Sequence, residues 1–142
     1  MEIVELFSLS APQTADLLGL MKELNDALPV TPDMLRSAAE SPSTHLFAAL
    51  ANGHIVGTSS LCITLTPTGR KGKIEDVVVS SSCRGLGLGR QLMQHALDYA
   101  RSHYAPIELS LTSNPSREAA NRLYRALGFS YYETNVYKLE IA

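Results

Sequence analysis

The sequence has little of several features that would point to particular classes of protein. Its two cysteines, Cys62 and Cys83, are far apart and near no histidine pair at metal-ligand spacing, so neither a disulfide framework nor a zinc motif is expected. No stretch approaches the roughly 20 apolar residues that cross a bilayer, and the first residues lack the basic start and apolar block of a secretory signal. Tryptophan is absent, the net charge is only −2, and no basic stripe with interleaved aromatic residues suits a nucleic acid. We therefore expect a cytoplasmic protein that binds no metal, nucleic acid or membrane.

The composition that is present fits one globular domain over residues 1–142. The hydrophobic fraction is 45%, which is enough to bury a core of ordinary size. The charge is uneven: residues 1–70 carry 3 basic and 7 acidic residues (net −4), whereas residues 71–142 carry 9 and 7 (net +2). The second half is therefore the better place to look for an anionic ligand.

The spacing of apolar residues predicts an alternation of strands and helices. Helical spacing predicts helices over residues 15–28, from Thr31 onward, over 89–103 and over 115–127. Alternating or β-branched runs predict strands over residues 2–8, 45–50, 55–65, 73–80, 106–111, 129–132 and 135–141, with Asn52 and Gly53 as a hairpin turn and 66–72 as a further turn. This order predicts a mixed sheet with helices on both faces.

The most informative segment is a strand that runs through a glycine-rich loop into a helix. Gly85, Gly87 and Gly89 lie in this loop, and Arg84 and Arg90 flank it. Backbone N–H groups at a helix N-terminus bind anions, and glycine lets a phosphate approach closely. The Walker pattern and the dinucleotide GxGxxG pattern both fail at these spacings. The alternative is that the glycines only shape a tight turn, but together with the arginines they favour a pyrophosphate site.

The RGLGLG motif at residues 84–89 resembles the acetyl-CoA signature of the GCN5-related N-acetyltransferase (GNAT) superfamily, and the order of elements is similar over essentially the whole chain. The resemblance implies a mostly antiparallel central sheet of about seven strands flanked by four helices. It implies that the CoA pyrophosphate binds to the backbone amides of Arg84, Gly85, Leu86, Gly87, Leu88, Gly89 and Arg90. It also implies that the preceding strand is splayed from its neighbour and binds pantetheine along Val77, Val78 and Val79.

Residues 111–129 resemble the later motif of the same superfamily, in which a helix carries a tyrosine shortly before Gly-Phe. Asn114 is expected to cap this helix, with Pro115 in its first turn. Arg117, Asn121 and Tyr124 share one helical face. The resemblance implies that Tyr124 protonates the departing CoA thiolate, that Asn121 contacts CoA or orients Tyr124, and that Asn114 belongs to the CoA site. The alternative is a solvated helix face with a core tyrosine.

A general base is harder to assign from the sequence. Glu75 and Asp76 are adjacent on a strand, so their side chains point to opposite faces. We prefer Glu75, because IEDVVV resembles superfamily members that act on amino sugars; the alternative is that both carboxylates face solvent or pair with Lys71 and Lys73. His45 and His54 are expected at the surface, and water relays could replace a side-chain base. Backbone N–H groups near Val78 could stabilise the oxyanion.

These features together predict an enzyme that transfers an acetyl group from acetyl-CoA to a primary amine, most simply of a small molecule, by direct attack on the thioester. A protein N-terminus or lysine side chain is the alternative acceptor. A non-catalytic acyl-CoA-binding module is a further alternative, which would have no need of Tyr124. The acidic first half favours a cationic acceptor. The C-terminal residues 131–142 are candidates for pairing two copies into a homodimer.

Overall fold

The chain, in a computed structural model that describes residues 1–142, divides into one unit over Met1–Leu111 and a second over Thr112–Ala142. The first unit is built on a sheet with the strand order β1-β2-β3-β4-β5. The strands are β1 (Glu2–Leu6), β2 (Thr44–Ala51), β3 (His54–Thr66), β4 (Gly69–Val79) and β5 (Glu108–Ser110). Neighbouring strands are antiparallel except β4 and β5, which are parallel. The sheet is therefore mixed and mostly antiparallel, as expected.

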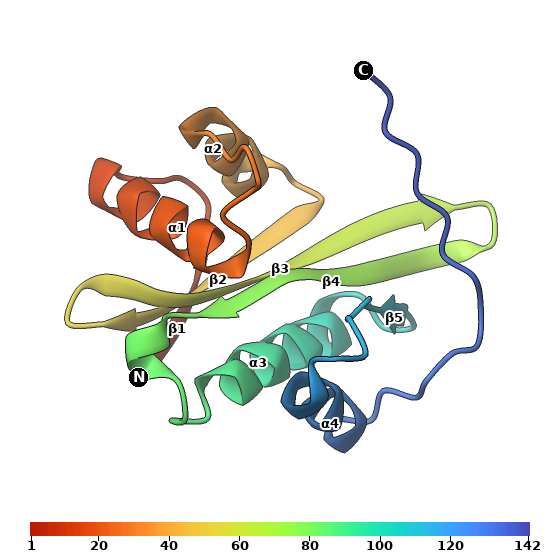
Figure 1. Cartoon of the computed structure of the whole chain (residues 1–142). Coiled ribbons are helices and arrows are strands. Elements are labelled where there is room, and N and C mark those ends of the chain that lie inside the picture. Colours follow the sequence, from red (N-terminus) through yellow and green to blue (C-terminus); the bar gives the residue numbers. More distant parts are fainter. The chain divides into compact units, whose positions relative to one another are not determined.

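Helices cover both faces of this sheet (Figure 1). Helices α1 (Ala11–Leu24) and α2 (Pro32–Glu40) lie on one face, and α3 (Leu88–His103) lies on the other. The core on the α1 and α2 side contains buried leucines of both helices together with strand residues such as Leu46 and Val78. On the α3 side, Phe47 and Leu61 are fully buried, and so are Leu92 and Met93 of the helix. The alternation of strand side chains thus supplies two apolar faces, one for each helical layer.

Local sequence signals set several of the element boundaries. Ser10 and Gln13 form a reciprocal capping box, so α1 begins at Ala11, four residues earlier than predicted, and it ends at Leu24 rather than at residue 28. Thr31 caps α2 as predicted, since its hydroxyl oxygen accepts a hydrogen bond of 3.2 Å from the Met34 N–H. Asn52 and Gly53 both have positive φ, 51° and 80°, which confirms the predicted hairpin turn.

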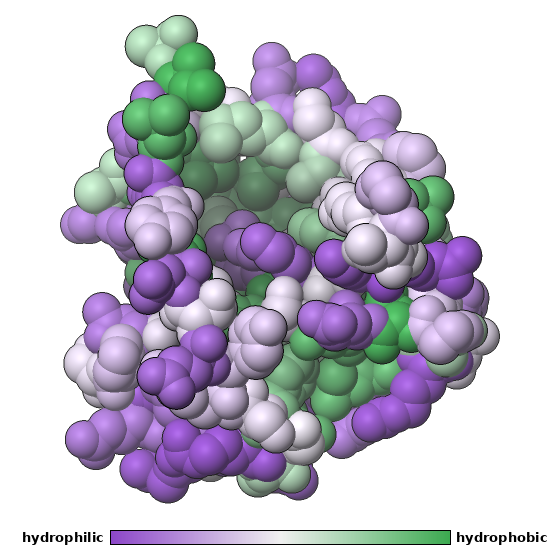
Figure 2. Space-filling model, turned by 90° about the vertical axis from the view of Figure 1, so that its right-hand side faces the viewer, coloured by the Kyte–Doolittle hydropathy of each residue, from purple (hydrophilic) through white to green (hydrophobic).

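The hairpin between β3 and β4 is longer than predicted. β4 begins at Gly69, inside the stretch predicted as a turn, because the Thr66 hydroxyl closes a tight connection by donating to the Gly69 carbonyl over 3.1 Å. Figure 2 looks onto the side of the molecule where this hairpin ends, and there hydrophilic and hydrophobic residues are interspersed.

The second unit contains one helix, α4 (Glu118–Ala126), which ends as predicted before a positive-φ glycine, Gly128. The prediction that this helix starts at residue 115 with Asn114 as its cap is wrong. The Asn114 side chain instead accepts a hydrogen bond of 2.9 Å from the Ser116 N–H, which closes a turn before the helix.

The two strands predicted over residues 129–132 and 135–141 are also wrong, because the structure assigns neither helix nor strand after residue 126. The sheet therefore has five strands rather than seven, while the prediction of four helices is confirmed. A strand is stable only when a neighbour satisfies its backbone groups. Here the apolar side chains of Val136, Leu139 and Ile141 are 74%, 83% and 88% exposed, so the alternating pattern buries no apolar face.

Candidate active site

The strand β4 has one free edge along the second half of its length. Its parallel pairing with β5 covers only Lys71 to Lys73, opposite Glu108 to Ser110. From Ile74 to Val79 the only strand partner is β3. Backbone N–H and C=O groups on that free edge can therefore receive an extended ligand in the manner of an added strand. Val77, Val78 and Val79, along which the sequence resemblance implied that pantetheine binds, lie in this part of β4.

A β-bulge lies in the same part of β4. Thr58 pairs with Val78 and Ser60 pairs with Glu75, so Asp76 and Val77 together face the single residue Ser59. Asp76 has a φ of 52°, in the left-handed region that is unfavourable for a residue with a side chain. The bulge shifts by one residue which β4 side chains point to each face of the sheet, so that Val78 packs in the core beside α1. Glu75 and Asp76 remain exposed at this bend.

The glycine-rich loop follows β4 and leads into α3. A short 3-10 turn spans Ser81–Cys83, and α3 begins at Leu88. Gly85 and Gly87 have φ values of 82° and 74°, which only glycine adopts without strain. Gly89 is different, because its φ is not positive and an added Cβ would meet only the Val79 side chain at 3.9 Å. Its lack of a side chain is therefore not required by the protein's own packing.

The N-terminus of α3 is left uncapped by side chains. Gly87 is the N-cap residue and makes no side-chain hydrogen bond to the helix. The first helical bond is from the Gln91 N–H to the Gly87 carbonyl, over 3.1 Å. The N–H groups of Leu88, Gly89 and Arg90 thus have no acceptor within the helix and point, with the helix dipole, toward the loop. This is the geometry of an anion site.

Glu23 of α1 was not expected at this site. Its carboxylate accepts a hydrogen bond of 2.9 Å from the Ser81 N–H, at the start of the loop. Hydrogen bonds from the Ser81 backbone and side chain, and then the Arg84 guanidinium, lower the pKa of Glu23. Arg84 itself donates to the Val79 carbonyl over 3.4 Å. Glu23 and Ser81 are 58 positions apart in the sequence, and no motif around Glu23 indicates this contact.

The proposed base Glu75 lies on β4 opposite Ser60. Glu75 and Asp76 are both exposed to solvent, as the alternative considered from the sequence allowed, and neither forms an ion pair with Lys71 or Lys73. On the neighbouring strand, burial raises the pKa of the Cys62 thiol, and the Glu75 and Asp76 carboxylates raise it further.

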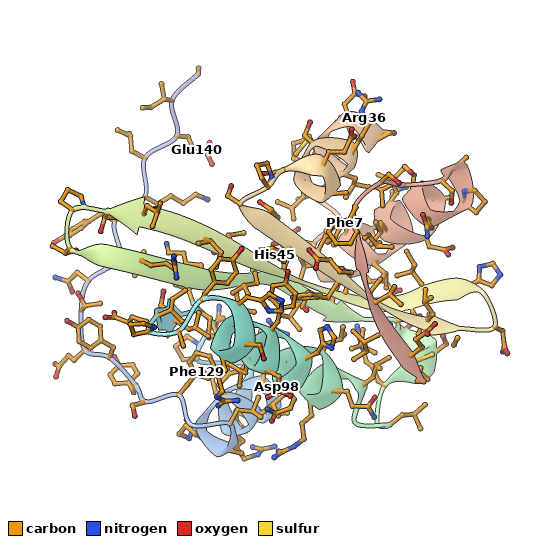
Figure 3. All side chains as sticks on the ribbon, turned by 180° about the vertical axis from the view of Figure 1, so that it is seen from behind. Phe7, Arg36, His45, Asp98, Phe129 and Glu140 are labelled. Atoms are coloured by element: carbon orange, nitrogen blue, oxygen red, sulfur yellow. The ribbon has the colours of Figure 1, made fainter.

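The two histidines behave differently from each other. His54 is exposed as predicted, with Nδ1 3.4 Å from Oδ2 of Asp16. The prediction that His45 is a surface residue is wrong. It is 8% exposed on the α3 side of β2, where its ring nitrogens contact Glu5 and Tyr104 (Figure 3).

The remaining predicted residues, Asn114, Asn121 and Tyr124, belong to the second unit. The Asn121 amide donates to the carbonyl oxygens of Asn114 and Arg117, over 3.0 and 2.7 Å, which leaves its own oxygen free to accept. Tyr124 is the buried residue of α4, and its ring meets that of Phe129 edge-on at 6.4 Å. Ala120, Leu123 and Leu127 of the same unit are half-buried.

No group of three or more histidine, cysteine or acidic side chains is placed to hold a metal ion. None of the helices combines the length and the apolar character that crossing a membrane requires.

Comparisons with known proteins agree with this geometry. Residues 9–129 match the model of the acetyltransferase (GNAT) family. A glucosamine 6-phosphate N-acetyltransferase of Trypanosoma brucei brucei is 33% identical over 138 residues, which is 92% of this chain and 91% of that protein. An aminoalkylphosphonate N-acetyltransferase of Salmonella typhimurium is 34% identical over 90 residues, or 62% and 58% of the two chains. A solved Trypanosoma brucei acetyltransferase is 30% identical, covers 99% of both chains and has a TM-score of 0.72.

The family match covers more than half of the chain, and it includes the free edge of β4, the glycine loop and α4. Enzymes of this family use acetyl-CoA as co-substrate. The chain therefore belongs to the acetyltransferase (GNAT) family and is an N-acetyltransferase.

Proposed function

We propose that the protein transfers the acetyl group of acetyl-CoA to the primary amine of a small molecule. The observation that carries this proposal is the free edge of β4, which runs directly into an uncapped helix N-terminus. An extended pantetheine arm and an anionic pyrophosphate are joined in the same order within CoA. The names of the two relatives, one acting on an amino sugar phosphate and one on aminoalkylphosphonates, support a small-molecule acceptor.

The cofactor residues follow from this arrangement. The backbone amides from Gly85 to Arg90 hold the pyrophosphate, and the Arg84 and Arg90 guanidinium groups pair with its oxygens. Pantetheine adds to the edge formed by Val77, Val78 and Val79. The resemblance assigns Asn114 and Asn121 to the CoA site, and residues 1–142 are proposed to form one acetyltransferase domain.

The chemical step is a direct attack. The amine nitrogen forms a bond to the thioester carbon, and backbone N–H groups near Val78 stabilise the oxyanion of the resulting tetrahedral intermediate. The carbon–sulfur bond then breaks and CoA leaves as a thiolate. The Tyr124 hydroxyl donates a proton to that sulfur, because a phenol is protonated at neutral pH. Glu75 accepts the proton that the attacking ammonium group must lose.

Tyr124→Phe tests the proposed role of this tyrosine as the acid. The substitution removes only a hydroxyl, so we expect kcat to fall about 100-fold with an unchanged Kd for acetyl-CoA. Tyr137→Phe is the matched control, because Tyr137 has no proposed role in catalysis and the variant keeps its aromatic ring. An unchanged kcat in Tyr124→Phe would remove this tyrosine from the mechanism.

Glu75→Gln tests the base. We expect kcat/KM to fall about 100-fold at neutral pH and to recover as the pH approaches the pKa of the amine, where the free amine needs no base. Asp76→Asn distinguishes the two carboxylates. A larger loss in Asp76→Asn than in Glu75→Gln would assign the base to Asp76 instead.

We also propose that two copies form a homodimer. The support is the set of exposed apolar side chains after residue 130, which a partner could cover: Tyr131, Tyr132, Val136, Tyr137, Leu139 and Ile141. Light scattering of the purified chain measures its mass directly. A mass of twice 15.4 kDa supports the dimer, and 15.4 kDa contradicts it.

A further inference from the structure

The face of β4 that carries Glu75 also carries two lysines. Lys71 pairs with Thr64, Lys73 with Cys62 and Glu75 with Ser60 in one register. Alternate side chains of a strand share a face and are separated by about 7 Å, so Lys71, Lys73 and Glu75 form a row. This row begins with two positive charges and ends with the proposed base.

The residues between these positions point to the opposite face, which shows which side the row occupies. The guanidinium of Arg70 lies 5.3 Å from the centre of the Tyr104 ring and donates to the Tyr104 carbonyl at the end of α3. A Cβ at Gly72 would meet the Leu109 side chain at 2.6 Å, and Ile74 is buried. The row therefore lies on the sheet face away from α3, which is the face that α1 and α2 partly cover.

Both lysines are free to bind a ligand. They are exposed, and neither forms an ion pair. The nearest strand thiol, Cys62, experiences the charges of Glu75, Asp76 and Lys73 together, which places these groups around one part of the face. Figure 1 shows that the hairpin end of β3 and β4 extends beyond α1 and α2. β4 begins at Gly69, so Lys71 and Lys73 belong to this end of the strand.

We infer that Lys71 and Lys73 bind a phosphate or phosphonate group of the acceptor, while its amine lies at Glu75. This inference rests on the proposed function, because it assumes that the amine is acetylated beside the β4 bulge. Ammonium groups form charge-assisted hydrogen bonds with phosphorus oxyanions. The spacing of the row suits an acceptor whose amine and anionic group are within roughly 10 Å of each other. This inference differs from the expectation of a cationic acceptor that was drawn from the acidic first half.

Matched pairs of amines test the inference. Glucosamine 6-phosphate is compared with glucosamine, and 2-aminoethylphosphonate with propylamine, by release of CoA thiol. In the wild-type protein we expect kcat/KM to be at least about tenfold higher for the anionic member of a pair. A preference confined to one pair identifies a phosphate ester or a phosphonate as the natural group.

Charge variants then locate the binding group. In the double variant Lys71→Gln/Lys73→Gln, the higher kcat/KM for the anionic amine should disappear. The kcat/KM for the neutral amine should stay within about twofold of the wild-type value. Lys71→Arg/Lys73→Arg keeps the positive charge and should keep the preference. Arg101→Gln is the control for net charge, because Arg101 is exposed on α3 and pairs only with Asp98.

The outcomes separate the inference from the proposed function. Failure of acetyl-CoA to bind contradicts the proposed function. Thiol release at equal efficiency within each pair, or a preference that survives the double Gln variant, overturns the inference alone. If none of the four amines is acetylated, the CoA-saturated protein is titrated calorimetrically with glucosamine 6-phosphate and with 2-aminoethylphosphonate. Binding that is lost in the double Gln variant supports the inference that Lys71 and Lys73 bind the anionic group. Absence of binding to the wild-type protein overturns it. Faster acetylation of an acidic peptide than of either anionic amine also overturns it.

Discussion

Nδ1 of His45 lies 2.7 Å from Oε2 of Glu5, and the two side chains are only 10% and 13% exposed. The other ring nitrogen of His45 contacts the hydroxyl of Tyr104, at the end of α3. If Nδ1 carries the proton, the ring donates to the carboxylate and accepts from the tyrosine, so all three groups are satisfied. The network joins β1, β2 and α3 in the first unit.

The first prediction follows from the burial of this pair. Glu5→Ala leaves the His45 ring without its acceptor, so we expect the free energy of unfolding to fall by about 2 kcal/mol. Asp33→Ala breaks an equally short contact, 2.6 Å to Arg36, but these side chains are 78% and 62% exposed, and the expected loss is under about 0.5 kcal/mol. Urea unfolding of both variants measures the difference. Equal losses would show that the buried network adds no stability.

The sequence did not reveal this network, and the reason is the distance along the chain. Glu5 and Tyr104 are 40 and 59 residues from His45, and only the fold brings them together. The same holds for Glu23 and Ser81. By contrast, Thr31, Asn52 and Gly87 act on the backbone within a few residues, so their effect on local structure could be predicted from the sequence alone.

The two strands that were predicted near the C-terminus, and that the structure lacks, show a second limit of sequence patterns. Residues 135–141 alternate apolar and polar side chains as a strand does, yet a strand also needs a partner, which no local pattern specifies. The bulge at Asp76 illustrates the same limit within the site. Its two-against-one register with Ser59 depends on the pairing of β3 and β4, and the IEDVVV segment gives no sign of it.

A second prediction concerns alkaline pH. Burial, and then the nearby Glu5 carboxylate, raises the pKa of Tyr99 to about 12, above its usual value near 10. The folded state therefore holds this proton more tightly than the unfolded state, so the stability it contributes is present below pH 10 and is lost as the pH rises toward about 12. Urea unfolding from pH 8 to pH 11.5 should show a shallower decline in Tyr99→Phe than in the wild type. Parallel declines would contradict the assignment.

A third prediction separates folding from ligand binding in the glycine loop. Gly87→Ala places a side chain at a φ of 74° and should cost about 1 kcal/mol of stability as well as affinity for acetyl-CoA. Gly89→Ala has room in the protein and lies in the first turn of α3, so stability should be unchanged or rise by up to about 1 kcal/mol. Its Cβ would obstruct the pyrophosphate, so the Kd for acetyl-CoA should still rise. An unchanged Kd in Gly89→Ala would place the pyrophosphate elsewhere.

A fourth prediction uses two neighbours in β3. Ser59 is fully buried, and its hydroxyl has no hydrogen-bond partner, so Ser59→Ala should be neutral or stabilising by about 1 kcal/mol. Thr58 is equally buried, but its hydroxyl donates to the Phe47 carbonyl over 2.7 Å. Thr58→Val should therefore destabilise the fold by about 1 kcal/mol. Thermal unfolding of both variants measures whether each one is stabilised or destabilised. A destabilised Ser59→Ala would mean that the Ser59 hydroxyl has a hydrogen-bond partner in solution.

The central claim is that this chain binds acetyl-CoA and passes its acetyl group to a small amine. The most direct measurement is calorimetric titration of the wild-type protein with acetyl-CoA, followed by thiol release in the presence of pooled small amines and of peptides. We expect binding in the micromolar range, and thiol release that depends on a pool of small amines. Absence of acetyl-CoA binding, or release that only peptides support, would contradict the claim.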